Sequence, residues 1–150
     1  MLRANSIGDL FDMAVAFARQ PLPKGNAVAI VTNAGGPGIM ATDALEKDGL
    51  RLAGLSPETQ AELQATLPAA ASVLNPVDVL GDARSDRYKI AFQAVLADEN
   101  VDSMLVILTP QFMTDIEEVA QVLVEAFEAQ PDDSRKPVFA CFIGEANMKE

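Results

Sequence analysis

Short apolar runs alternate along the chain with segments of helical periodicity, and this alternation constrains the fold more than any other feature. The clearest run is AVAIVT at residues 27–32, which leads directly into a glycine-rich segment and then a helical pattern. Strands that alternate with helices pair in parallel, because each helix returns the chain to the same edge of the sheet. The expected strands are residues 27–32, 50–53, 72–79 (interrupted at 75–76), 102–109 and 138–143.

We therefore expect an α/β, flavodoxin-like, doubly wound domain of three layers that spans residues 1–150. Right-handed crossovers favour a five-stranded parallel sheet in the order 2-1-3-4-5. Hydrophobic residues make up 49% of the chain but aromatic residues only 5%, which predicts an aliphatic core. Such a core suits a sheet covered by helices on both faces. The abrupt ends lead us to expect a fragment of a larger chain.

The charge and the rare residue types exclude several classes of function. A net charge of -11 would repel nucleic acid and anionic membranes, so neither is an expected partner. The chain has no histidine, which excludes His-dependent triads and the usual zinc sites. It also lacks an apolar run long enough to cross a bilayer.

The single cysteine, Cys141, lies in the apolar run 138–142. One cysteine cannot form an internal disulfide, which favours a reducing, cytoplasmic setting. A free cysteine in such a run is usually buried, so we predict a structural thiol rather than a nucleophile.

In sheets of this kind, ligands bind beyond the carboxyl ends of the strands, where the strand order reverses. Four segments of the chain are expected there: residues 33–38, 75–78, 109–111 and Gly144. Thr109 and Gln111 are candidate residues of a substrate cleft.

The segment NAGGPG at residues 33–38 is the most specific of the four. A helix that starts near Pro37 would direct the free N–H groups of Gly38, Ile39 and Met40 outward and form a small anion site. The plain alternative is that the glycines only pack the helix closely on the strand. The pattern also satisfies G-x-G-x-x-A, but Leu52-Ala53-Gly54 supplies no acidic residue for NAD, and no Gly-Lys-Ser/Thr follows for a nucleoside triphosphate.

The segment NPVD at residues 75–78 is the second candidate. Proline inside a strand marks a bulge or an edge, and Asp78 then either faces the cleft or caps a loop. Asn75 and Asp78 are therefore candidate cleft residues, with both alternatives open. We expect no metal site and no catalytic residue, and the acidic cluster Asp115, Glu117 and Glu118 fits the first turn of a helix.

Three stretches resemble a known family. They are QPLPKGN before the first strand, VTNAGGPGIMATDA across the first turn, and ASVLNPVDVLG around the third strand. With the looser NVDSMLVILTPQ, they look like the last domain of the α part of ADP-forming acetyl-CoA synthetases, which are relatives of succinyl-CoA synthetase. The resemblance covers nearly the whole chain.

The resemblance implies a reaction in which acyl-CoA, ADP and phosphate give acid, CoA and ATP. The phosphoryl group passes through an acyl phosphate to a histidine, which carries it to an ATP-grasp site. CoA, ADP or ATP and Mg would be used by the complete enzyme, with no cofactor bound here. The implied partners are the neighbouring CoA-binding, phosphohistidine-bearing and ATP-grasp domains.

By similarity to succinyl-CoA synthetase, the helix after the first strand points at the phosphohistidine. The matching positions are Asn33, Ala34, Gly35, Gly36, Pro37, Gly38 and Ile39. The loop from Thr109 to Gln111 would lie near the acyl pocket, although the glycines found there in succinyl-CoA synthetase are missing.

Three hypotheses of different classes follow. The favoured one is a ligase domain that stabilises phosphoryl transfer electrostatically and contributes nothing covalent. The second is a regulatory, acyl-CoA-sensing domain fused to a protein lysine acetyltransferase. The third is a flavin-binding module, which would need aromatic residues beside the ring, whereas the only tyrosine, Tyr88, lies on an expected helix.

Overall fold

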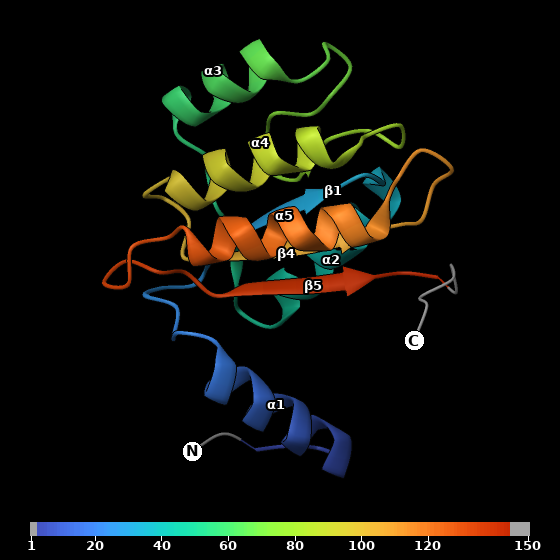
Figure 1. Cartoon of the computed structure of the whole chain (residues 1–150). Helices are drawn as coiled ribbons and strands as arrows, with labels where there is room; N and C mark the ends of the chain where they lie inside the picture. Colours follow the sequence, from blue (N-terminus) through green and yellow to red (C-terminus); the bar gives the residue numbers. More distant parts are fainter. Residues whose placement is uncertain (1–2, 145–150) are drawn as a thin grey trace.

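A computed structural model describes residues 3–144 and shows a three-layer α/β domain with one helix, α1, set apart from the layers (Figure 1). Strands and helices alternate as the sequence predicts. The elements in chain order are α1 Ile7–Arg19, β1 Ala27–Thr32, α2 Gly35–Lys47, β2 Arg51–Leu52, α3 Pro57–Thr66, β3 Val77–Asp78, α4 Ser85–Ala97, β4 Ser103–Leu108, α5 Ile116–Glu128 and β5 Val138–Phe142.

β1 is the central strand, and all six of its residues are buried. It pairs with β4 over five positions, from Val28 opposite Ser103 to Thr32 opposite Ile107, and β4 pairs in turn with β5. All strand pairs are parallel, as expected. The predicted fold class, a five-stranded α/β domain of flavodoxin type, is confirmed.

The position of β3 differs from the expected order 2-1-3-4-5. The sheet runs β2-β1-β4-β5, and β3 pairs with β1 on the same side as β2. The outer edge of β3 is already occupied, because Ser72 and Asp78 exchange backbone hydrogen bonds of 3.1 and 3.0 Å. β3 therefore has no free edge for β4, which pairs directly with β1.

Between β2 and β3, the side chain of Asn75 completes the edge of β1. Its Oδ1 accepts from the N–H of Ile30 at 2.9 Å, and its Nδ2 donates to the carbonyl oxygens of Val28 and Ala53 at 2.8 and 3.0 Å. β2 covers only the start of β1 and β3 only its end. Asn75 thus replaces the strand that is missing between them.

The two faces of the sheet are covered unequally (Figure 1). α4 and α5 lie on one face and pack on each other, and α3 lies beyond α4. The buried core lies under them and includes Tyr88, Phe92, Met104, Val106 and Leu108, each 0% exposed. α2 packs on the opposite face, against β1 and β2.

Most helix starts follow local signals. Ser6 and Asp9 form a capping box at α1, and Ser56 caps α3 with Pro57 in the first turn. At α5 the N-cap is Asp115, which accepts from the N–H of Glu118. α2 begins at Gly35, two residues before the expected start.

α1 has no buried residue, and Phe11 is 66% exposed. One expectation about burial is wrong. Cys141 was expected to be buried but is exposed, because β5 is the edge strand and its burial is incomplete. No helix within residues 3–144 is long and apolar enough to cross a membrane.

Replacing Asn75 tests its role at the edge of β1. Asn75→Ala removes the partner of the buried Ile30 N–H and should lower the free energy of unfolding by about 1–3 kcal/mol. Urea denaturation measures the effect. The control is Asn26→Ala, since exposed Asn26 donates one hydrogen bond to Gly49; equal effects of the two substitutions would contradict the assignment.

Candidate functional site

Three of the expected segments meet at the carboxyl ends of the strands. Asn33 follows β1 and Thr109 follows β4, and their contacts join the two strand ends. From the third segment, Asp78 Oδ2 would lie 3.4 Å from a Cβ on Gly35, whereas Asn75 bonds to Ile30 in the middle of β1. Gly144, the fourth, would place a Cβ 3.4 Å from Pro110 Cδ.

Asn33 extends the pairing of β1 and β4 by one step. Its Nδ2 donates to the Thr109 carbonyl oxygen at 2.8 Å, and its Oδ1 accepts from the Thr109 N–H at 2.9 Å and hydroxyl at 3.1 Å. Oδ1 thus accepts two hydrogen bonds and Nδ2 donates one, and Asn33 is only 4% exposed. Asn33 fixes the geometry of this edge from a buried position.

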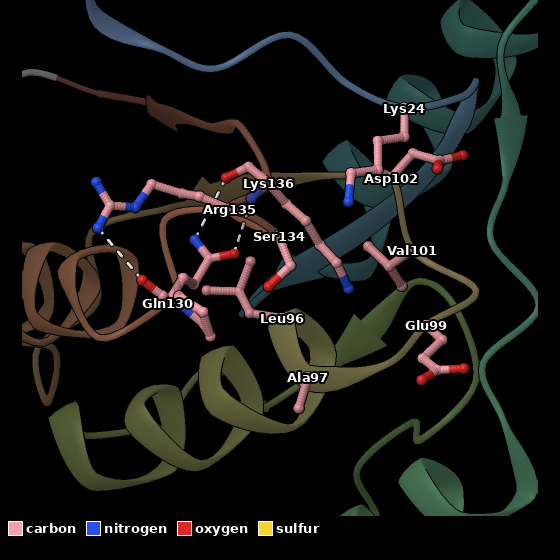
Figure 2. Close-up of a pocket in the computed structure, with 11 residues that line it drawn as sticks. Lys24, Leu96, Ala97, Glu99, Val101, Asp102, Gln130, Ser134, Arg135 and Lys136 are labelled. Atoms are coloured by element: carbon pink, nitrogen blue, oxygen red, sulfur yellow. Dashed lines mark hydrogen bonds between the residues drawn. The ribbon is translucent and has the colours of Figure 1, made fainter.

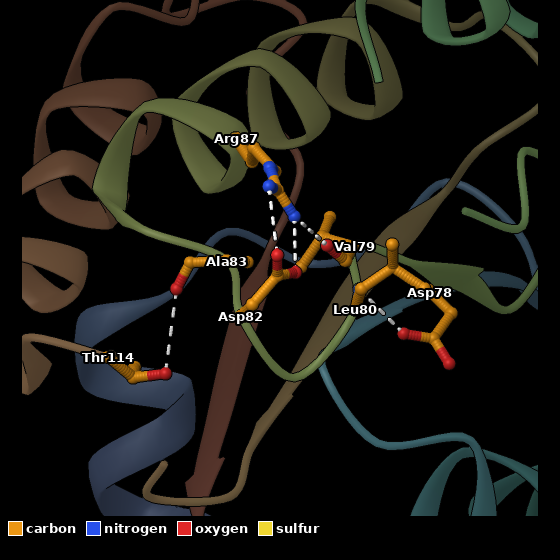
Figure 3. A network of polar contacts seen from close by, with 7 residues as sticks. All are labelled: Asp78, Val79, Leu80, Asp82, Ala83, Arg87 and Thr114. Atoms are coloured by element: carbon orange, nitrogen blue, oxygen red, sulfur yellow. Dashed lines mark hydrogen bonds and ion pairs between the residues drawn. The ribbon is translucent and has the colours of Figure 1, made fainter. Parts of the chain in front are cut away.

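The loop after β3 is held by a polar network (Figure 3). Asp78 Oδ1 accepts from the N–H of Leu80 at 2.9 Å, and Leu80 has a φ of 74°, a region that costs non-glycine residues energy. Arg87 bridges the Val79 carbonyl oxygen and Asp82, with its Nη1 2.6 Å from Asp82 Oδ1. The hydrogen bond from Arg87 lowers the pKa of Asp82.

The first turn of α2 offers two backbone donors. Within the described residues, no acceptor is found for the N–H groups of Gly35 and Gly36, and Pro37 has none to offer. The Ala34 N–H donates to Thr32 Oγ1 at 3.0 Å, and the Gly38 N–H donates to the Ala34 carbonyl oxygen at 3.3 Å. The free donors are therefore at Gly35 and Gly36, not at Gly38, Ile39 and Met40 as expected.

The glycines of this turn have separate roles. A Cβ on Gly36 would meet nothing within 4 Å, whereas a Cβ on Gly38 would lie 3.3 Å from Thr32 Cγ2 and 3.6 Å from Pro76 Cβ. Gly38 thus allows α2 to pack closely on the sheet, and Gly36 keeps the N-terminus of α2 free of side chains. The structure bears out the packing alternative at Gly38, and the anion site stays a prediction whose open donors would lie at Gly35 and Gly36.

Asp78 adds a negative charge beside these donors. A Cβ on Gly35 would lie 3.4 Å from Asp78 Oδ2, which accepts no hydrogen bond from the residues described here. Burial, and then the charge of Asp78, raise the pKa of the Tyr88 hydroxyl. The edge can thus donate hydrogen bonds to an anion through the backbone and accept one from a ligand N–H or O–H at Asp78.

Sequence reasoning gave no sign of two surface features. Phe112, just after Gln111, is fully exposed at the carboxyl edge, and an isolated aromatic in a loop carries no periodic signal. A cavity of about 530 Å³ lies at the amino ends of the strands, lined in part by Lys24, Glu99, Asp102 and Lys136 (Figure 2).

Two of the charged side chains in this cavity hydrogen-bond to backbone groups. Lys136 Nζ donates to the Asp98 carbonyl oxygen, and Asp102 Oδ2 accepts from the Ala27 N–H at 2.9 Å. Burial lowers the pKa of Lys136, and the carboxylates of Asp98 and Asp102 oppose that shift. No group of three or more potential metal ligands occurs in residues 3–144.

Comparison with protein families decides the kind of domain. The Ligase-CoA domain family matches residues 28–150, most of the chain. The chain belongs to this family. Its relatives are larger proteins, and the Ligase-CoA domain described here is one part of them.

Two relatives show how much longer than this chain such proteins are. The chain is 43% identical over 146 residues to the α subunit of an ADP-forming acetate–CoA ligase II of Pyrococcus furiosus, covering 95% of this chain and 31% of the relative. It is 37% identical over 150 residues to an ADP-forming acetate–CoA ligase I of Archaeoglobus fulgidus, covering 100% and 20%. The chain thus spans a fifth to a third of their length.

Solved structures agree. A Ca. Korarchaeum cryptofilum dinucleotide-forming acetyl-coenzyme A synthetase 1, in complex with phosphate and ADP, matches with a TM-score of 0.84 and 31% identity, over 96% of this chain and 31% of that one. A protein of Pyrococcus horikoshii OT3 matches with a TM-score of 0.87 and 42% identity, over 96% and 33%. The chain is therefore a domain of the ADP-forming acetyl-CoA synthetase family.

The two glycines of the Ligase-CoA domain can be separated by substitution. Gly38→Leu forces a side chain against Thr32 and Pro76 and should lower the free energy of unfolding by about 1–3 kcal/mol. Gly36→Ala meets no neighbour and should raise it by about 0.5–1 kcal/mol, because alanine has less freedom to lose on folding. Urea denaturation of both variants checks this, and similar effects at the two positions would refute the separate roles.

Proposed function

We propose that this domain stabilises a phosphoryl group during turnover of an ADP-forming acyl-CoA ligase. The observation that carries the proposal is the open N-terminus of α2, where the N–H groups of Gly35 and Gly36 lack acceptors within the described chain. A helix N-terminus attracts phosphate through such N–H groups and through the helix dipole. The solved relative that contains phosphate and ADP supports the same chemistry.

The reaction would be that of the relatives, with acyl-CoA, ADP and phosphate giving acid, CoA and ATP. A phosphoryl group that moves between sites keeps its negative charge at each step. Backbone donors fixed in a first helical turn stabilise that charge without having to reorganise. Gly35 and Gly36 would donate to its oxygens, and the closed pairing of Asn33 with Thr109 would keep the turn rigid.

Asp78 would give this site a preference among anions. A carboxylate beside the donors repels a fully ionised phosphate, but it accepts a hydrogen bond from a protonated oxygen or a ring N–H. The favoured ligand is therefore a phosphoryl group that brings a proton donor with it. A phosphohistidine presented by a neighbouring domain has both parts.

The covalent step would take place outside this chain. The chain has no histidine to carry the phosphoryl group. CoA, ADP or ATP and Mg²⁺ would be bound by other domains of the ligase, including the CoA-binding and ATP-grasp domains. This domain would contribute the N–H donors and the positive end of the α2 dipole to a site shared with them.

A charge placed at Gly36 tests the proposal in the complete ligase. Gly36→Glu adds a carboxylate at the mouth of α2, where acidic residues suit the helix, so folding should be preserved. We expect ATP formation from acetyl-CoA, ADP and phosphate to fall by about 10²-fold or more, because the added carboxylate repels the phosphoryl group from donors that are each worth about that factor.

The matched control is Gly54→Glu, since a Cβ on exposed Gly54 also meets nothing within 4 Å. This variant adds the same charge away from the edge and should retain wild-type turnover. Wild-type turnover in Gly36→Glu would rule out the phosphoryl role of the turn. A ligase without turnover in any form would instead favour the regulatory hypothesis.

A further inference from the structure

The cavity at the amino ends of the strands lies at the other end of the sheet from the N-terminus of α2, and the phosphoryl role makes no use of it. Its volume of about 530 Å³ is within the range of about 300–1,000 Å³ that is usual for small-molecule sites. Its floor is apolar, because Leu96 is 7% exposed and Val101 is 2% exposed. Polar groups that converge over such a floor are the usual pattern of a ligand site.

Two ammonium groups in the cavity have unused donors. Lys136 Nζ is partly buried and donates to the Asp98 carbonyl oxygen, and Lys24 Nζ donates to the Asp133 carbonyl oxygen at 3.3 Å. Within residues 3–144, neither group forms an ion pair with a carboxylate. Figure 2 shows both side chains reaching into the cavity, whereas the guanidinium of Arg135 points away from it. An ammonium group carries three donors, so each lysine can bind a further acceptor.

The two positive charges lie close enough to affect each other. Burial lowers the pKa of Lys136, and the charge of Lys24 adds to this shift. The carboxylates of Asp98, Asp102 and Glu99 oppose it. An anion between the two ammonium groups would stabilise both, because it supplies the negative charge that favours their charged forms.

The carboxylates of the cavity disfavour a ligand that is only an anion. The carboxylate of Asp98 accepts from two backbone N–H groups at 2.7 and 2.9 Å, and Oδ2 of Asp102 accepts from the Ala27 N–H. Oδ1 of Asp102 and the exposed carboxylate of Glu99 accept no hydrogen bond from the part of the chain described here. They would repel bare phosphate but accept from hydroxyl or amino groups, so the favoured ligand carries both an anion and such donors.

We propose that this cavity binds a nucleoside monophosphate. Lys24 and Lys136 would hold the phosphate as point charges. Glu99 and Oδ1 of Asp102 would accept hydrogen bonds from hydroxyl or amino groups of the nucleoside, and the apolar floor would hold the base. The site is separate from the N-terminus of α2, and its existence does not depend on the phosphoryl role.

An NMR titration of the isotope-labelled chain with AMP measures affinity and location together. We expect saturable shifts of the amide signals of residues 96–102 and 130–136, which include most of the cavity lining. Adenosine and inorganic phosphate, titrated separately, should each bind at least about 10-fold more weakly than AMP, because each lacks part of the recognised groups.

Lys136→Met removes the ammonium group and keeps the length of the side chain. The Asp98 carbonyl oxygen still accepts from the Val101 N–H at 3.1 Å, so the fold should be preserved. We expect the affinity for AMP to fall at least about 10-fold, the effect of one lost charge-assisted hydrogen bond. Lys24→Met changes an exposed position and should lower the affinity in the same direction.

The matched control is Lys89→Met, which removes one positive charge from an exposed pair with Glu125 on the surface of α4 and α5. Its affinity for AMP should equal that of the unmodified chain. An equal loss in Lys89→Met and Lys136→Met would overturn the proposal, because net charge alone would then explain the binding. No saturable shift with AMP, or phosphate alone binding as tightly as AMP, would overturn it as well.

Gly36→Glu separates this site from the phosphoryl site. The variant chain should bind AMP like the unmodified chain, because Gly36 lies at the carboxyl edge of the sheet. Loss of AMP binding in Gly36→Glu, with binding retained in Lys136→Met, would assign the phosphate to α2 and overturn the proposal. The titration does not involve ATP formation, so the failure of either proposal leaves the other standing.

Discussion

The fold depends on satisfying the backbone of β1. All six residues of this strand are buried, so every N–H and carbonyl group on both of its edges needs a partner inside the protein. One edge is matched along its length by β4. The other is shared by three short pieces: β2, the Asn75 side chain and β3. This pairing positions the loops at the carboxyl ends of the strands.

An asparagine side chain takes the place of a backbone partner at two points on β1. The amide of Asn75 fills a gap in the middle of one edge, and the amide of Asn33 prolongs the other edge toward Thr109. An asparagine side chain carries one acceptor and a donor group with the geometry of a peptide, so it can replace a residue of a neighbouring strand. The edge that would face a phosphoryl group is thereby held rigid by buried hydrogen bonds.

The chemistry of the carboxyl edge follows from the polar groups that have no partner in the strand pairing. Asn33 and Thr109 are engaged with each other, Gly38 is pressed on the sheet, and the donors of Gly35 and Gly36 remain beside Asp78 Oδ2. Such an edge can stabilise a charge but offers no nucleophile, which agrees with a domain that works together with others.

The sequence by itself determined the alternation of strands and helices and the parallel pairing of the sheet. These features are local or follow from periodicity and chain direction. The roles of Asn33 and Asn75 required the structure, because a hydrogen bond between residues 45 or 76 positions apart leaves no periodic trace.

Tertiary structure also decided which apolar residues are buried. The stripe of α1 and the run containing Cys141 are both apolar, yet α1 has no buried residue and the middle of the run is exposed in this domain. An apolar pattern indicates a face that is suited to burial, but it does not identify what covers that face. The position of β3 was open for a similar reason: with two residues, it carries too little pattern to fix a neighbour, and the reciprocal bonds of Ser72 and Asp78 on its outer edge settled its place.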